Sequence, residues 1–290
     1  MKPHLQRFID DYLAELVEGN AAIFAGAGLS VPAGFVDWRT LLRPLSEDLD
    51  LDIDLETDLV AVAQFHVNAN GLNRHKLHKA LLETLSKDAK PTKNHRLLAQ
   101  LPITTFWTTN YDKLIEVSLH EGGKVADVKS SVPQMATTRP HHDVTVYKTH
   151  GDIDRPNEAV ITKEDYVDYP KKRAPFITAL AGDLVKKTFL FVGFSFTDPN
   201  LDHVLAQVRY HFSVDQRQHY AFFKSRSKQQ GETDEHFAHH LARQKHVIED
   251  LKRFNVKVLL IDEYSEITEV LTALANRYRR RTVFSECLQF

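Results

Sequence analysis

Residues 20–30 read NAAIFAGAGLS, and this stretch decides the fold. Its first six residues, Asn20 to Ala25, form a short apolar run typical of a buried strand. The run passes directly into Gly26-Ala27-Gly28-Leu29-Ser30. A strand followed at once by a glycine turn is typical of the opening unit of a nucleotide-binding α/β domain.

Beyond this stretch, apolar runs of strand length alternate with runs of helical spacing. An amphipathic helix is expected over residues 5–18, ahead of the glycine turn. Strands are expected at 103–109, 144–149, 188–194, 220–224 and 256–261, and helices at 112–120, 200–211, 233–254 and 265–280, with two more between 159 and 185. This order predicts an α/β protein built on a doubly wound, Rossmann-like parallel sheet of about six strands.

One long segment interrupts the alternation. From Trp38 to about Gln100, apolar residues recur at helical spacing and no strand signal appears. A segment of about 60 residues is too long for one crossover helix, so an inserted helical module is expected over about 38–100. No segment rich in Gly, Pro or Ser separates independent domains, and residues 1–290 are predicted to form one domain. Residues 121–143 are polar and are expected to be irregular.

The composition excludes several classes of protein. The chain has 290 residues, of which 42% are hydrophobic, and its net charge of -2 gives no sign of a general nucleic-acid binder. The start of the chain lacks the apolar segment of a signal peptide. The longest strongly apolar stretch, residues 189–197, is too short to span a bilayer, so a soluble cytoplasmic protein is expected. Cys287 is the only cysteine, which excludes an intramolecular disulfide and a cysteine-based zinc module within one chain.

Polar motifs follow four of the predicted strands. In a doubly wound sheet the carboxyl ends of the strands share one edge, and ligands bind in the crevice outside that edge. Four motifs are therefore expected to converge there: GAGLS (26–30), TTNYD (108–112), THGD (149–152) and GFS (193–195).

The glycine turn supplies two positions without a Cβ, which lets backbone amides approach a diphosphate closely. A helix starting after Ser30 would add the positive end of its dipole. The dinucleotide motif G-x-G-x-x-G is not completed, because Val31 stands at its last position, and no P-loop sequence follows. A glycine-containing turn without a ligand is the alternative interpretation, and the motif alone does not decide between the two.

Asn110, His150 and Ser195 are polar residues just beyond apolar strands. An amide can hold a ribose hydroxyl or a water, an imidazole can take up a proton, and a small hydroxyl can bind phosphate or ribose. Each has a structural alternative: a turn serine, a hydrogen-bonded histidine among the 16 of the chain, or, for Asn110 and Asp112, a cap on the next helix. Asp198, which precedes a proline, is expected to cap a helix and is given no chemical role.

A group of histidines in the predicted helix 233–254 suggests a metal site: His236, His239, His240 and His246. That helix is expected to bury an apolar stripe made by Phe237, Leu241, Ile248 and Leu251. Most of the histidines would then lie on its solvated side, and no H-E-x-x-H pattern is present. No metal site is predicted.

Together, GAGLS, TTNYD, THGD and GFS, in this order and at these separations, resemble the sirtuin-like (SIR2-like) NAD-binding fold, and more narrowly its bacterial branch of NAD-consuming anti-phage defence proteins. The resemblance runs from Asn20 through the VKVLLID strand. It implies that Asn110 and His150 are catalytic. It also implies a set of residues that contact NAD+: Ala25, Gly26, Ala27, Gly28 and Ser30 in the phosphate- and ribose-binding loop, Asp112 near the catalytic asparagine, and Gly193 and Ser195 in the G-x-S loop.

Two departures from sirtuin deacetylases bear on the activity. Those enzymes carry a Pro-Asp-Phe-Arg stretch after the glycine loop, and the matching region here reads VPAGFVDWRTLL. Asp37 and Trp38 are the cofactor-contacting residues that this match implies, with Trp38 in place of the phenylalanine. Sirtuin deacetylases also share a four-cysteine zinc module that helps to build the acetyl-lysine cleft, and one cysteine cannot supply it. The peptide-binding half is therefore expected to be absent, with the helical insertion in its place.

The resemblance thus implies an NAD+ glycohydrolase that takes NAD+ as substrate, uses no metal, and releases nicotinamide and ADP-ribose. A freely active enzyme would deplete the NAD+ of its own cell, so control by assembly is expected: a homo-oligomer, or a complex with a HerA-like ATPase or an Argonaute-like protein, with no membrane and no sequence-specific nucleic-acid binding. The chain length leaves little room for a sensor domain, which favours regulation in trans. Three alternatives stay open: a non-catalytic NAD- or ADP-ribose-binding subunit, a zinc-free protein deacylase, and a structural subunit with a decayed site.

Overall fold

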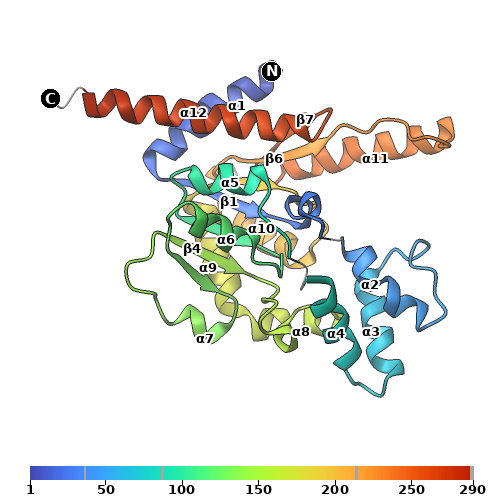
Figure 1. Ribbon diagram of the computed structural model, residues 1–290. Helices are drawn as coiled ribbons and strands as arrows, with labels where there is room; N and C mark the ends of the chain where they lie inside the picture. The colour runs from blue at the N-terminus through green and yellow to red at the C-terminus, as the bar shows by residue number, and fades with distance from the viewer. Residues whose placement is uncertain (36, 86–87, 213–214, 288–290) are drawn as a thin grey trace.

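The structure, a computed structural model, describes residues 1–35, 37–85, 88–212 and 215–287 (Figure 1). Its strands form one sheet in the order β3-β4-β2-β1-β5-β6-β7, and every neighbouring pair is parallel. The strands are β1 (Ala21–Ala25), β2 (Thr105–Thr108), β3 (Ala126–Lys129), β4 (Val144–Lys148), β5 (Thr188–Val192), β6 (His219–Lys224) and β7 (Val256–Ile261). The predicted doubly wound parallel α/β fold is confirmed.

The sheet has seven strands, one more than expected, because β3 lies in the segment that was expected to be irregular. Its apolar residues Ala126 and Val128 pack against one core of the molecule. Asp127 and Lys129 point to the other face and pair with each other at 2.8 Å. The buried face of β3 therefore carries two charged residues, at an i, i+2 spacing, that neutralise each other. Because strands are recognised in sequence by apolar residues, this strand gives no such signal.

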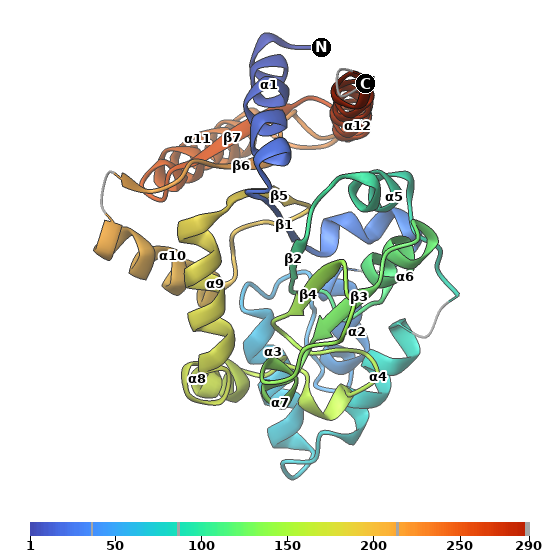
Figure 2. The same ribbon diagram turned by 90° about the vertical axis from the view of Figure 1, so that its left-hand side faces the viewer.

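Helices cover both faces of the sheet, as strands buried on both sides require. One face carries α1 (Pro3–Glu18), α5 (Lys93–Gln100), α6 (Leu114–Glu121) and α12 (Ser265–Cys287). The other carries α9 (Ala174–Lys186), α10 (Pro199–Phe212) and α11 (Asp234–Lys252). Strand β1 shows the alternation directly, since Ile23 belongs to the first core and Phe24 to the second. Helices α1 and α12 pack side by side at one end of the molecule (Figures 1 and 2).

A separate helical module stands where the long strandless segment was expected. Helices α2 (Trp38–Glu47), α3 (Leu59–Ala69) and α4 (His75–Leu85) pack around a core of their own (Figure 2). That core includes Tyr111 and Ile161, which follow β2 and β4, so the module sits beyond the carboxyl ends of these strands. Helix α5, by contrast, packs with α6 and α12 on the sheet.

Helix α11 differs from its expected packing. Of its predicted apolar stripe, Leu251 is buried, whereas Phe237, Leu241 and Ile248 are only partly covered. The helix projects past the sheet (Figure 1), which leaves its first half with few neighbours. Its four histidines are exposed. No helix in the described residues is both long and apolar enough to cross a membrane.

Candidate functional site

The four motifs meet at the carboxyl edge of the sheet. Strand β1 is flanked by β2 on one side and β5 on the other, so the chain order reverses at β1. A reversal of this kind opens a crevice between loops that leave the sheet in opposite directions, and ligands of doubly wound sheets bind there. The loops after β1, β2, β4 and β5 carry the motifs, and contacts between these loops hold them together.

The glycine turn after β1 packs directly on the loop after β5. The N–H of Gly26 donates to Val192 O and that of Gly28 to Gly193 O, both at 2.9 Å. A Cβ on Gly26 would lie 2.4 Å from Gly193 O, and one on Gly193, whose φ is +66°, would lie 2.2 Å from the nitrogen of Leu29. Only glycine fits at these positions, because the two backbones are in contact in this conformation.

No α-helix starts directly after Ser30. Residues 27–29 and 31–33 form two short 3-10 turns, and the first α-helix after the glycine turn, α2, begins only at Trp38. Pro32 and Gly34, whose φ is +94°, break the path between them. The dipole of an α-helix starting at Ser30 therefore cannot contribute to anion binding here.

Asn110 joins the loop after β2 to the glycine turn. Its Nδ2 donates to Gly26 O and to Ser30 Oγ, each at 3.1 Å. Asn110 and Ser30 are buried, so these bonds are shielded from water. Asp112 accepts from the N–H of Leu114 at 2.9 Å, just ahead of α6, whose N-cap residue is Lys113.

His150 contacts Asp198, which was expected only to cap a helix. Its Nε2 lies 2.8 Å from Oδ2 of Asp198, in the loop between β5 and α10, and both side chains are almost fully buried. Asp198 also caps α10 as expected, because Oδ1 accepts from the N–H groups of Asn200 and Leu201 at 2.8 and 3.3 Å. Burial raises the pKa of Asp198, but His150 and the two amides outweigh it and hold the pKa below its usual value.

The imidazole of His150 lies in an aromatic pocket. Tyr166 and Tyr169, from α8 (Lys163–Lys172), approach it edge-on, with ring centroids at 5.5 and 6.2 Å. Burial raises the pKa of both phenols, so they stay protonated at neutral pH. Among the described residues, Asn200 Nδ2 and both ring nitrogens of His150 are buried without a hydrogen bond, so the close contact of Nε2 with Asp198 is not aligned as one. His150 and Asn200 line one small cavity. Unsatisfied polar atoms of this kind are typical of a functional site.

The remaining predicted site residues differ in their surroundings. Ala25 ends β1 and is buried, Ala27 is partly covered, and Gly28 is exposed. The Ser195 hydroxyl is exposed and bonds to Thr197 at 2.8 Å.

Asp37 and Trp38 belong to the helical module rather than to the crevice in this conformation. The exposed Asp37 side chain caps α2 by accepting from Thr40 N at 2.9 Å, and Trp38 packs against the core of the module. Neither is among the residues that line the two cavities described here.

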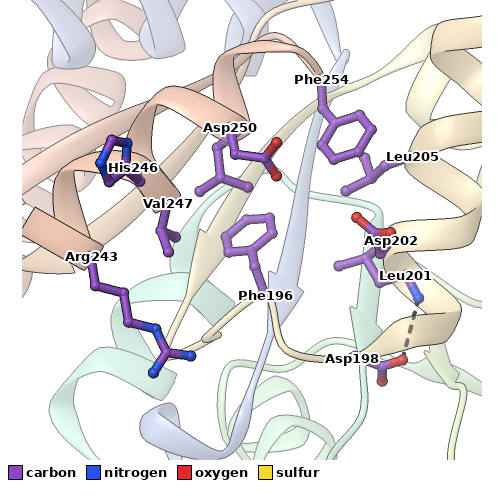
Figure 3. Close-up of a pocket in the computed structure, with 11 residues that line it drawn as sticks. Phe196, Asp198, Leu201, Asp202, Leu205, Arg243, His246, Val247, Asp250 and Phe254 are labelled. Atoms are coloured by element: carbon purple, nitrogen blue, oxygen red, sulfur yellow. Dashed lines mark hydrogen bonds between the residues drawn. The ribbon is translucent and has the colours of Figure 1, made fainter. Parts of the chain in front are cut away.

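A larger pocket of about 340 Å³ lies between α10 and α11 (Figure 3). Its floor is apolar, with the Phe196 ring projecting into it, and charged side chains line its sides, among them Arg243, Asp202 and Asp250. Asp198 and Leu201 line both this pocket and the small cavity beside His150. Within the described part of the chain, no group of three or more His, Cys, Asp or Glu side chains is placed to hold a metal ion.

The fold and the clustered motifs are those of SIR2-like proteins, and the comparisons agree. Residues 104–247 match the family model described as a SIR2-like domain. The chain thus contains a SIR2-like domain.

Its similarity to individual proteins is extensive. It is 48% identical over 284 residues to the NAD(+) hydrolase ThsA of Bacillus cereus (strain MSX-D12), a match that covers 98% of this chain and 60% of that protein. It is 50% identical over 285 residues to the protein of the same name from Acinetobacter baumannii (strain 532279), covering 98% of this chain and 59% of that protein. The Defense-associated sirtuin 2 of Bacillus subtilis is 27% identical over 201 residues, or 66% of this chain and 19% of that protein. The chain therefore spans about 60% of the length of the first two relatives.

Proposed function

We propose that this protein hydrolyses NAD+ to nicotinamide and ADP-ribose. The observation that carries the proposal is the group of loops at the carboxyl edge of the sheet. There Asn110 binds the glycine turn, and His150, which lines a cavity together with Thr109, lies against a carboxylate. The NAD(+) hydrolase names of relatives 48% and 50% identical to this chain support it.

The chemistry needs little from the protein beyond placement and charge. Water forms a bond to C1′ of the ribose while the bond from C1′ to the pyridinium nitrogen breaks. The bonding electrons pass to that nitrogen, which leaves neutral nicotinamide, so the leaving group needs no proton. The water loses one proton. The protein has to stabilise positive charge on the ribose and to place the water.

His150 is the base in this proposal. In this proposal Nε2, 2.8 Å from Asp198 Oδ2, carries the proton and Nδ1 keeps its lone pair. That lone pair is available to accept a proton from the water or from a ribose hydroxyl. Asn110 orients the ribose and the water through its amide. The exposed face of the glycine turn and Ser195 bind the phosphates and the ribose.

The site is closed in this conformation, with His150 3% and Asn110 7% exposed. NAD+ can reach both only if the covering groups move, foremost the loop of Asp198 and the tyrosines of α8. We propose that assembly controls this opening, either in a homo-oligomer or with a partner such as a HerA-like ATPase or an Argonaute-like protein. We propose that the regulated enzyme acts in the bacterial cytoplasm, as part of anti-phage defence. Native mass spectrometry tests it: an assembled, regulated enzyme is expected, and a monomer with unregulated activity would contradict it.

The deciding experiment follows NAD+ by chromatography, with the purified protein alone and with the product of the neighbouring gene. Equal amounts of nicotinamide and ADP-ribose are expected. Binding of NAD+ or ADP-ribose without turnover under every condition would instead identify a regulatory subunit. Release of O-acyl-ADP-ribose from an acylated peptide would identify a deacylase.

A further inference from the structure

The most deeply buried lysine among the described residues follows the strand that leads to His150. Lys148 is the last residue of β4, two positions before His150, and its side chain is 0% exposed. A fully buried ammonium group is costly unless hydrogen bonds and opposite charges compensate it. Its partners therefore indicate what keeps it there.

All of those partners come from two loops and the helix that follows one of them. Nζ donates to the carbonyl oxygens of Tyr111 at 3.0 Å and Asp112 at 2.6 Å, directly after Asn110. It also pairs with Asp152 at 2.7 Å, two residues after His150, and with Glu116 of α6 at 3.0 Å. One ammonium group thus joins the loop of Asn110 to the loop of His150.

The charges favour a lysine that stays ionised. Burial lowers the pKa of Lys148, but the two carboxylates outweigh it and raise the pKa above its usual value. Burial raises the pKa of Glu116, whose Oε2 has no hydrogen-bond partner among the described residues. Asp152 and Glu116 are both counter-charges of Lys148, and Asp152 belongs to the loop that carries His150.

We propose that Lys148 is a positioning residue that fixes the separation and orientation of Asn110 and His150 by clamping their two loops together. This role rests on the proposed function, because the clamp would hold the Asn110 amide and the His150 imidazole at the separation that the reaction needs. Lys148 itself touches neither substrate nor reacting atoms. A misplacement of about 1 Å between catalytic groups can cost about 100-fold in rate, so a clamp at this place has a large effect on turnover.

The test replaces Lys148 and Asp152 together, so that neither is left without the other. The variant Lys148→Met/Asp152→Asn removes one positive and one negative charge, and an asparagine can still accept the bond from Asp154 N at 2.9 Å. The matched control is Lys129→Met/Asp127→Asn in β3. That pair is also buried and 2.8 Å apart, but it lies at the edge of the sheet.

Two readouts are measured on the intact protein: kcat and Kd for NAD+, and hydrogen exchange of residues 109–113 and 149–153. In the Lys148 variant, kcat is expected to fall by about 100-fold with Kd changed by less than about threefold. Both loops should exchange faster, whereas the control should change neither readout. Exchange and kcat equal to those of the control would overturn the clamp.

A milder variant decides the matter if the double variant does not fold. Asp152→Asn alone leaves Lys148 on the carbonyl oxygens of residues 111 and 112 and weakens its tie to the loop of His150. Exchange should then rise in 149–153 and not in 109–113. An equal rise in both segments, or none in either, would contradict the proposal. If the wild type turns over no NAD+, the proposed hydrolase function fails, and the exchange data still decide whether the clamp exists.

Discussion

Nε2 of His150 lies 2.8 Å from Oδ2 of Asp198, although the two residues follow strands that are not neighbours. Strands β4 and β5 are separated in the sheet by β2 and β1. At about 4.8 Å between adjacent strands, their ends are roughly 14 Å apart. The pair therefore bridges the ends of β2 and β1, where the loop of Asn110 and the glycine turn leave the sheet, and it joins both sides of the crevice.

Replacing Asp198 with asparagine separates its two roles. An asparagine caps a helix as well as an aspartate does, so α10 should start normally. The amide would place either a weaker acceptor or a donor against His150 Nε2, and the imidazole would lose the carboxylate that fixes its tautomer. We expect NAD+ turnover to fall by about 100-fold or more. The nitrogen chemical shifts of His150 should show the change of tautomer.

Asp58→Asn is the matched control for this variant. Asp58 caps α3 by accepting from Ala61 N at 3.0 Å, and no histidine pairs with it in the described part of the chain. The Asp58→Asn variant should leave NAD+ turnover unchanged. Normal turnover in Asp198→Asn, with the Nε2–H tautomer retained, would show that the carboxylate does not orient the base.

Two glycine substitutions test the packing of the strand-end loops. Gly26→Ala places a Cβ 2.4 Å from Gly193 O, so the two backbones must separate. We expect a loss of about 3 kcal/mol in the free energy of unfolding, measured by urea titration. Gly182→Ala, in α9 with nothing within 4 Å of the added Cβ, should instead gain about 0.5–1 kcal/mol. Equal stability of the two variants would show that the loops are not in contact in solution.

His95 makes the stability depend on pH. Burial lowers its pKa to about 4, from 6.5. Below pH 6.5 the unfolded chain binds a proton here that the folded chain does not yet bind, so the free energy of unfolding falls as the pH drops from 6.5 toward 4. His95→Gln removes this titration and keeps the capping box with Thr92, since glutamine is a usual residue at that position.

Urea titrations of both proteins at about pH 7 and about pH 4.5 check this prediction. The wild type should lose about 2 kcal/mol more than the variant between the two conditions. A parallel decline in the two proteins would mean that His95 is protonated in the folded state.

Much of the fold could be predicted because the buried strands are apolar and the glycine turn is local. NAAIFA and TFLFV became β1 and β5, the central pair of the sheet. Strand β3 was missed because its buried face is made of a lysine and an aspartate, which a search for apolar runs passes over. The helix whose dipole would have aided the glycine turn does not start at Ser30, since Pro32 and Gly34 shape that segment into short turns.

The site could be predicted only in part, because some of its residues have an ordinary local role in the sequence. Motifs at strand ends identify Asn110 and His150, because parallel strands bring their carboxyl ends to one edge. Asp198 and Lys148 were not found, since their local sequence already has a simple explanation: one is a helix cap before proline and the other is the end of a strand. Only the contacts across β4, β2, β1 and β5 show what these two residues face.

NAD+ turnover by matched pairs of variants tests directly whether His150 and Asn110 carry the reaction. His150→Gln is compared with His66→Gln, because His66 is equally buried and lies 3.2 Å from Asp48 in the helical module. Asn110→Asp is compared with Asn255→Asp, whose amide donates to Gln216 O at 2.8 Å before β7. Turnover is expected to be at least about 100-fold below wild type in His150→Gln and Asn110→Asp, and near wild type in both controls. Full turnover in His150→Gln and Asn110→Asp would contradict it.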